Sequence, residues 1–169
     1  NAGRLQRISL LISAIEQYLS QGGQLKFAFA GSGVYSTRIQ ELANNFENVI
    51  YKGLISPQEA AQLNADYEWA LLPIDDEVTK YAFPSKSSSY VLSGASILAI
   101  CGGHTSVANW VINNQLGCVV NPNQEALVKA FFDIEQGLIE PSDLENRIAL
   151  SEALKFDVFV DKLNGIVFD

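Results

Sequence analysis

The sequence predicts an α/β fold in which a parallel sheet carries helices on both faces. Short apolar runs, typical of buried strands, alternate with stretches whose apolar residues recur every three or four positions, as on one face of a helix. Most links between these segments are short, so we expect parallel strands joined by right-handed crossovers. The chain has 169 residues, of which 48% are hydrophobic, and this is enough for a single domain with its own core.

The elements follow from local patterns in chain order. A helix is predicted over residues 7–20, where an apolar stripe runs from Ile8 to Leu19 and two glycines follow. A helix over 57–65 is predicted from the capping-box spacing of Ser56 and Glu59, with Pro57 at its first position. The other expected helices are 39–46, 85–93, 107–113, 127–134, one opened by a second capping box at 142–145, and 156–167. The expected strands are 25–30, 49–51, 69–74, 97–101 and 118–120.

Composition narrows the classes of function. The net charge of −8 disfavours a nucleic-acid partner, because phosphate contacts need a basic face. No apolar run approaches the roughly 20 residues of a membrane span, and no signal-peptide pattern is found. Cys101 and Cys118 lie in apolar runs, as reduced core cysteines of a cytoplasmic protein do. The chain contains no methionine, so we expect it to be a piece of a longer protein.

The first candidate site is the start of the helix predicted at 85–93, where Lys86 lies between Ser85 and Ser87. Backbone N–H groups at a helix N-terminus attract anions, and a lysine adds a full positive charge. Ligands of a parallel sheet bind beyond the carboxyl ends of its strands, and this loop follows a predicted strand. We interpret Ser85 and Lys86 as a phosphate site; the structural alternative is a capped helix with a solvated lysine.

A glycine-rich loop follows the strand predicted at 25–30. Gly31 and Gly33 would let the backbone approach a phosphate closely, or would form only a tight turn. Position 36 is Ser36, so the third glycine of a dinucleotide-binding loop is missing, and a dinucleotide site is disfavoured.

Two more loops carry polar residues. The loop 102–106 offers backbone N–H groups and hydroxyls, and His104 is either a contact for a sugar hydroxyl or phosphate, or a surface histidine. The acids Asp75, Asp76 and Glu77 are either an acid–base or metal group, or a solvated loop. His104 is the only histidine and Cys–His metal spacing is absent, so we expect no metal site and no cofactor.

Further motifs occur in order along residues 3–167. The most specific is Phe83-Pro84-Ser85-Lys86, followed by Tyr90, Gly94 and Ile97-Leu98-Ala99. The others are Gly3-Arg4-Leu5, Phe29-Ala30-Gly31-Ser32-Gly33, Val49-Ile50-Tyr51-Lys52-Gly53-Leu54 with Glu59, Ala65-Asp66 with Leu71-Leu72-Pro73, Gly102-Gly103, and Gly117-Cys118-Val119-Val120 with Pro122. This ordered set resembles the C-terminal, donor-binding domain of GT-B glycosyltransferases. In particular, it is similar to members of glycosyltransferase family 4 that build bacterial surface polysaccharides.

The resemblance implies roles for the matching positions. The positions that would bind the donor diphosphate are Arg4, Gly31, Gly33, Ser85 and Lys86. Those near the base and ribose would be Leu54 and Ser89, and those bordering the transferred sugar would be Gly102, Gly103, His104 and Ser106. The glutamates of the family's motifs are replaced by Tyr81, Ser89 and Ser106. Serine can still hydrogen-bond a hydroxyl, but it lacks the charge that strengthens such a bond about twofold.

The expected function is therefore transfer of a sugar from a nucleoside diphosphate sugar to a glycan or lipid-linked acceptor. The chain would be one Rossmann-like half of a GT-B fold, and an N-terminal acceptor domain would lie outside it. The resemblance also implies a retaining, metal-independent reaction and allows peripheral membrane association of the full-length protein. Two alternatives stay open: a nucleotide-sugar epimerase on the same fold, for which Asp75, Asp76 and Glu77 would supply acid–base groups, and a degenerate, non-catalytic nucleotide-binding domain.

Overall fold

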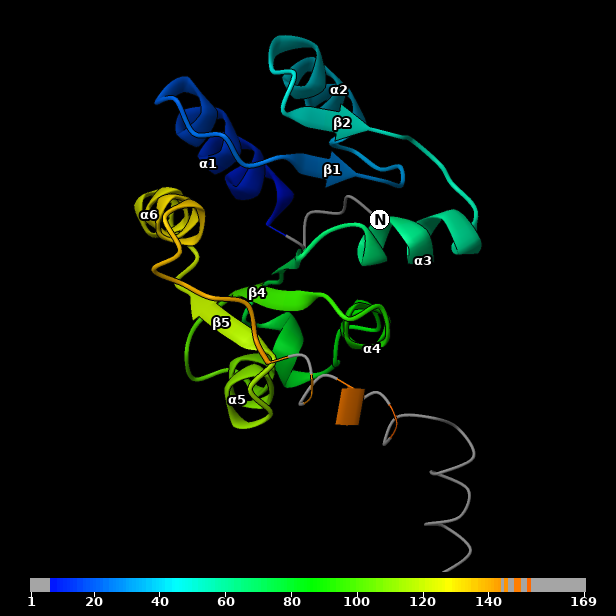
Figure 1. Cartoon of the computed structure of the whole chain (residues 1–169), viewed down its shortest axis with the longest axis vertical. Coiled ribbons are helices and arrows are strands. Elements are labelled where there is room, and N and C mark those ends of the chain that lie inside the picture. Colours follow the sequence, from blue (N-terminus) through cyan, green and yellow to red (C-terminus); the bar gives the residue numbers. More distant parts are fainter. Residues whose placement is uncertain (1–6, 144, 146–147, 150–151, 153–169) are drawn as a thin grey trace, which may run out of the picture.

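The computed structural model describes residues 7–143, 145, 148–149 and 152, and within them strands and helices alternate (Figure 1). The helices are α1 (Ile8–Ser20), α2 (Ser36–Asn45), α3 (Pro57–Ala65), α4 (Lys86–Leu92), α5 (Ser106–Asn113) and α6 (Gln124–Glu135). The strands are β1 (Phe27–Phe29), β2 (Val49–Tyr51), β3 (Trp69–Pro73), β4 (Ser96–Ile100) and β5 (Gly117–Val120). Every predicted strand is confirmed, as are the helices predicted up to residue 134. The helix predicted at 156–167 and part of the second capping box lie outside the described residues.

The strands are parallel, as predicted, but they form two sheets rather than one. β1 pairs with β2, placing Phe27 opposite Val49. The second sheet has the order β3-β4-β5, with Leu71 opposite Leu98 and Ala99 opposite Val119. The sequence pattern identifies strands but does not reveal which strand edges pair, so the division of the sheet was not predicted.

Strand β4 is buried on both faces, which explains its continuous apolar sequence. Leu98 and Ile100 belong to a core cluster shared with α1, α2 and α6. The alternate residues Ile97 and Ala99 belong to a second cluster shared with α4 and α5. Since successive side chains of a strand point to opposite faces, helices cover both sides of the second sheet. The predicted α/β arrangement with helices on both faces is thus confirmed.

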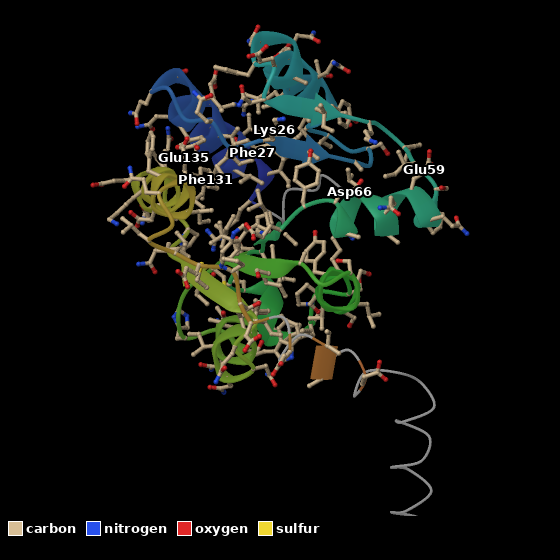
Figure 2. All side chains as sticks on the ribbon, in the orientation of Figure 1. Lys26, Phe27, Glu59, Asp66, Phe131 and Glu135 are labelled. Carbon is tan, nitrogen blue, oxygen red and sulfur yellow. The ribbon has the colours of Figure 1, made fainter. Side chains whose placement is uncertain are left out.

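Tyr18 joins α1 to α6 and to the segment that enters β1. Its ring is fully buried, and its hydroxyl accepts hydrogen bonds from the backbone N–H groups of Gln24 (3.1 Å) and Leu25 (3.0 Å). The same hydroxyl donates to Oε2 of Glu135 at 2.8 Å. Phe27 and Phe131 pack edge to face beside it, with ring centroids 5.2 Å apart, and Figure 2 shows both near Glu135. This junction ties the first core cluster together across more than 100 residues of sequence.

The junction predicts a loss of stability at alkaline pH. Burial, together with the Glu135 carboxylate, raises the pKa of Tyr18 from 10.0 to about 12. The folded state therefore holds the phenolic proton more tightly than the unfolded state. The stabilisation that the protonated Tyr18 hydroxyl gives to the folded state is complete below pH 10.0 and is lost as the pH rises towards 12. We expect the difference in unfolding free energy between the wild type and Tyr18→Phe, measured in urea, to shrink over that interval. Parallel stability profiles for the two proteins would contradict this assignment.

Helix α3 is held by local interactions rather than by the core. Its capping box is confirmed: Ser56 Oγ accepts from the Glu59 N–H at 3.2 Å, and Glu59 Oε2 accepts from the Ser56 N–H at 2.8 Å. The latter bond, from the Ser56 backbone, lowers the pKa of Glu59. No residue of α3 is buried, and Figure 1 shows the helix lying between the two sheets, towards one side of the molecule.

The two cysteines are free thiols, as predicted. Cys101 is buried and accepts a hydrogen bond from Thr105 Oγ1 at 3.2 Å. Burial raises the pKa of Cys101 and raises that of Cys118 to about 11, so both thiols stay protonated near neutral pH. Among the described residues, no helix is both long enough and apolar enough to cross a membrane.

Candidate functional site

The loops that follow β3 and β4 are joined by the carboxylate of Asp76. Asp76 Oδ1 accepts hydrogen bonds from the backbone N–H of Gly102 at 3.0 Å and from Arg7 Nη2 at 3.1 Å. Arg7 also donates from Nε to the carbonyl of Ile74, the residue after β3, at 2.9 Å. The end of β3, the end of β4 and the start of α1 therefore meet at a single carboxylate.

A second connection joins the same loops through Thr79, in the short 3-10 helix η2 (Val78–Lys80). Thr79 Oγ1 donates to the Asp76 carbonyl at 2.7 Å, and Ser106 Oγ donates to the Thr79 carbonyl at 3.1 Å. Thr105 begins α5 as its N-cap, because its hydroxyl accepts from the Ala108 N–H. The loop 102–106, predicted to border the sugar, is thus fixed at both of its ends.

Helix α4 carries the predicted phosphate residues. Ser85, Lys86 and Ser89 are all exposed, whereas Ser87 is buried and donates its hydroxyl to the Pro84 carbonyl at 2.6 Å. Within the described part of the chain, Lys86 makes no ion pair. Its ammonium group is therefore available to an anion from solution.

The segment before α4 is held by an aromatic contact. The rings of Phe83 and Trp110, a residue of α5, pack edge to face with their centroids 5.2 Å apart. Tyr81, at the first of the replaced glutamate positions, is 87% exposed and lies two positions before Phe83.

The predicted glycine loop belongs to the first sheet. Gly31 has a backbone φ of 110°, which residues with a Cβ rarely adopt. Its N–H donates to the Gly53 carbonyl at 2.6 Å. The Gly33 N–H donates to Ser36 Oγ at 2.9 Å. Leu54, the predicted neighbour of the base, is 80% exposed just beyond Gly53. The loops after β1 and β2 are therefore joined at Gly31 and Gly53.

The predicted site residues thus fall into two groups. Gly31, Gly33 and Leu54 follow the first sheet; Ser85, Lys86, Ser89, Gly102, Gly103, His104 and Ser106 follow strands of the second sheet. None of the hydrogen bonds described above joins a residue of one group to a residue of the other. Arg4 lies outside the described residues, so its role stays a prediction, as do the roles of the others.

The sequence does not predict the hydrogen bonds that connect the loops after β3 and β4. The residues that make them are Arg7, Asp76 and Thr79. The sequence indicates Asp76 only as an acid–base or metal candidate, together with Asp75 and Glu77. In the structure Asp75 Oδ1 caps the Glu77 N–H at 3.0 Å, and Glu77 pairs with Lys80 at 2.7 Å. No group of three metal-ligating side chains is found in the part of the chain that the structure describes.

Comparison with known proteins identifies the fold. No protein-family model and no curated protein sequence matches the chain. Among solved structures, the pneumococcal O-GlcNAc transferase GtfA in complex with UDP and GlcNAc is similar over 99% of this chain, with a TM-score of 0.69 and 15% identity. AviGT4, a glycosyltransferase involved in avilamycin A biosynthesis, is similar over 86% of this chain, with a TM-score of 0.59 and 15% identity.

The chain has a glycosyltransferase-like fold. At 15% identity, the likeness extends to the arrangement of helices and strands and not to individual site residues. This chain spans 34% of the length of GtfA and 42% of that of AviGT4.

Proposed function

We propose that this chain is the donor-binding half of a nucleotide-sugar-dependent glycosyltransferase. The observation that carries the proposal is the fold likeness, which extends over 99% of the chain, to a glycosyltransferase whose structure contains UDP and GlcNAc. A nucleoside diphosphate sugar is accordingly the ligand class that we assign to the loops after the strands. This position agrees with the general preference of parallel α/β sheets for ligands beyond their carboxyl ends.

Lys86 is the residue that we assign to the donor diphosphate. Its side chain is exposed and unpaired within the described region, in a protein whose net charge is −8. Overall charge would therefore repel a diphosphate, and a local cation is needed to hold it. Positive charge beside the diphosphate would also stabilise it as a leaving group during sugar transfer.

The finer features of the proposal come from the sequence resemblance. The complete enzyme would have a GT-B architecture of the family 4 type, work in the cytoplasm on polysaccharide precursors, and retain configuration without a metal. A glycan or lipid-linked acceptor would bind a second, N-terminal domain outside this chain, and the full-length protein would associate peripherally with a membrane. This chain alone is expected to bind the donor without transferring its sugar.

The test is calorimetry of the chain with UDP, GDP and ADP and with the corresponding nucleotide sugars. Lys86→Ala is expected to raise the dissociation constant of the bound nucleotide about tenfold or more, because a charge-assisted hydrogen bond is lost. Lys26→Ala is the matched control, since Lys26 is also exposed but directly precedes β1 instead of following a strand. Equal affinity in Lys86→Ala and wild type would contradict the phosphate assignment, and a wild type that binds none of the ligands would contradict donor binding altogether.

A non-catalytic nucleotide-binding domain is the second candidate, and one observation favours it. The acid expected in the sugar loop is replaced by Ser106, whose hydroxyl is already used in the bond to the Thr79 carbonyl. The two candidates differ in turnover: a protein containing this chain and its acceptor domain would transfer sugar from the donor in the first case and only bind it in the second. By contrast, the bonds made by Asp76 commit that carboxylate to the loops and so disfavour the epimerase alternative.

A further inference from the structure

We propose that Asp76 is a positioning residue that fixes the loop 102–106 so that Gly103 and His104 can contact the sugar of the donor. This inference rests on the proposed function, because it assigns the sugar subsite to that loop. Asp76 itself makes no contact with the ligand in this proposal; it acts through the backbone of Gly102.

The first argument is that the loop is anchored at both ends while Gly103 and His104 are exposed. Gly102 is held by its N–H bond to Asp76 Oδ1 at 3.0 Å, and Ser106 by its hydroxyl bond to the Thr79 carbonyl at 3.1 Å. Thr79 is in turn bonded to the carbonyl of Asp76. Gly102 is buried, whereas Gly103 and His104 between the anchors are exposed. The residues left accessible are therefore those that a ligand could reach, presented by a loop with little freedom.

The second argument is the close packing around Gly102. A Cβ built on Gly102 would lie 2.6 Å from Asp76 Oδ2 and 2.8 Å from His104 Cε1. The carboxylate and the imidazole therefore both lie against the α-carbon of Gly102, and a side chain at this position would have to displace them. Asp76 thus helps to determine the path of the backbone at Gly102.

The third argument concerns charge. The side chains of Arg7 and Asp76 are only 24% and 25% exposed, so the carboxylate is partly removed from water and needs partners. Arg7 supplies one charged hydrogen bond to Oδ1 and anchors itself on the Ile74 carbonyl through Nε. Arg7 Nη2 also lies 3.8 Å from Asp75 Oδ2, so its charge is shared between two carboxylates of this loop. Arg7 therefore orients Asp76 and does not serve as the cation for the donor diphosphate. Loops preorganised in this way avoid the cost of ordering during binding.

The test compares the binding of UDP and UDP-N-acetylglucosamine by calorimetry in four forms of the chain. In Asp76→Ala the affinity for UDP-N-acetylglucosamine is expected to fall about tenfold, with the affinity for UDP unchanged, because only the sugar subsite depends on this anchor. Asp76→Asn keeps an oxygen that can accept from Gly102 and is expected to recover part of the loss. Asp75→Ala is the matched control: it removes an acid from the same loop that lies 3.8 Å from Arg7 Nη2 but makes no bond to Gly102, so it should bind both probes as the wild type does.

A second measurement does not depend on the ligand. Amide hydrogen exchange within 102–106 is expected to be faster in Asp76→Ala than in the wild type and Asp75→Ala. Equal losses of affinity for both probes, or unchanged exchange in Asp76→Ala, would overturn the positioning role while leaving the proposed function in place. A wild type that binds neither probe would overturn the sugar subsite and, if no other nucleotide binds, the proposed function with it.

Discussion

Gly117→Ala is expected to lower the free energy of unfolding by about 3 kcal/mol or more, because it combines backbone strain with a backbone clash. Gly117 opens β5 with φ 147°, a conformation that residues with a side chain rarely adopt. A Cβ at this position would lie 2.1 Å from the carbonyl oxygen of Ile97 and 2.7 Å from its nitrogen. Ile97 belongs to β4, which is buried on both faces, so the strand cannot move aside. A loss of this size is a large fraction of the roughly 5–15 kcal/mol that holds a typical domain folded.

Gly137→Ala is the matched control for this prediction. Gly137 also has a positive φ, of 69°, but a Cβ there would meet no atom within 4 Å. Gly137→Ala should therefore lower the free energy of unfolding by the backbone strain alone, about 1 kcal/mol. Chemical denaturation of both variants would separate the cost of backbone strain from that of the clash with Ile97. Similar losses of unfolding free energy in the two variants would show that the contact with Ile97 does not control the stability of β5.

The sequence was informative about the elements because their causes are local. The capping residues Ser56 and Glu59 lie three positions apart, and the hydrogen bonds expected from that spacing are present. The continuous apolar run at 97–101 predicts a strand, and the run is continuous because both faces of β4 are buried. The short helix η2 and the division into two sheets were not predicted, since they depend on which segments meet and not on any local pattern.

The candidate site was only partly predictable for the same reason. The loop 102–106 could be located because glycines and hydroxyls follow a predicted strand. The residues that anchor this loop could not be located from the sequence, since Asp76 is 26 positions from Gly102 and Arg7 is 69 positions from Asp76. No spacing rule connects residues so distant, and Asp76 has two acidic neighbours of similar appearance. The three acids became distinguishable only when the hydrogen bonds of each were known.

The pair Gly22-Gly23 illustrates how one sequence signal can conceal two different roles. The sequence pattern assigns both glycines to the end of the first helix, and Gly22, with φ 91° and no atom within 4 Å of a built Cβ, fits that role. Gly23 has a different function: a Cβ there would lie 2.2 Å from Cζ of Tyr18 and 2.4 Å from both Cε atoms. Gly23 is therefore needed for the space it leaves to the buried ring.

Gly23→Ala is accordingly expected to cost about 3 kcal/mol of unfolding free energy, at the upper end of what overpacking a core costs. The Tyr18 ring cannot turn away, because its hydroxyl is bonded to Gln24, Leu25 and Glu135 and the ring packs edge to face with neighbouring aromatic rings. Tyr18→Leu removes the atoms that would clash, so Gly23→Ala should cost much less in that background, and a double-mutant cycle measures the difference. Gly22→Ala is the control and should cost about 1 kcal/mol in either background. An equal cost of Gly23→Ala with and without the ring would mean that the contact with Tyr18 does not dictate glycine at this position.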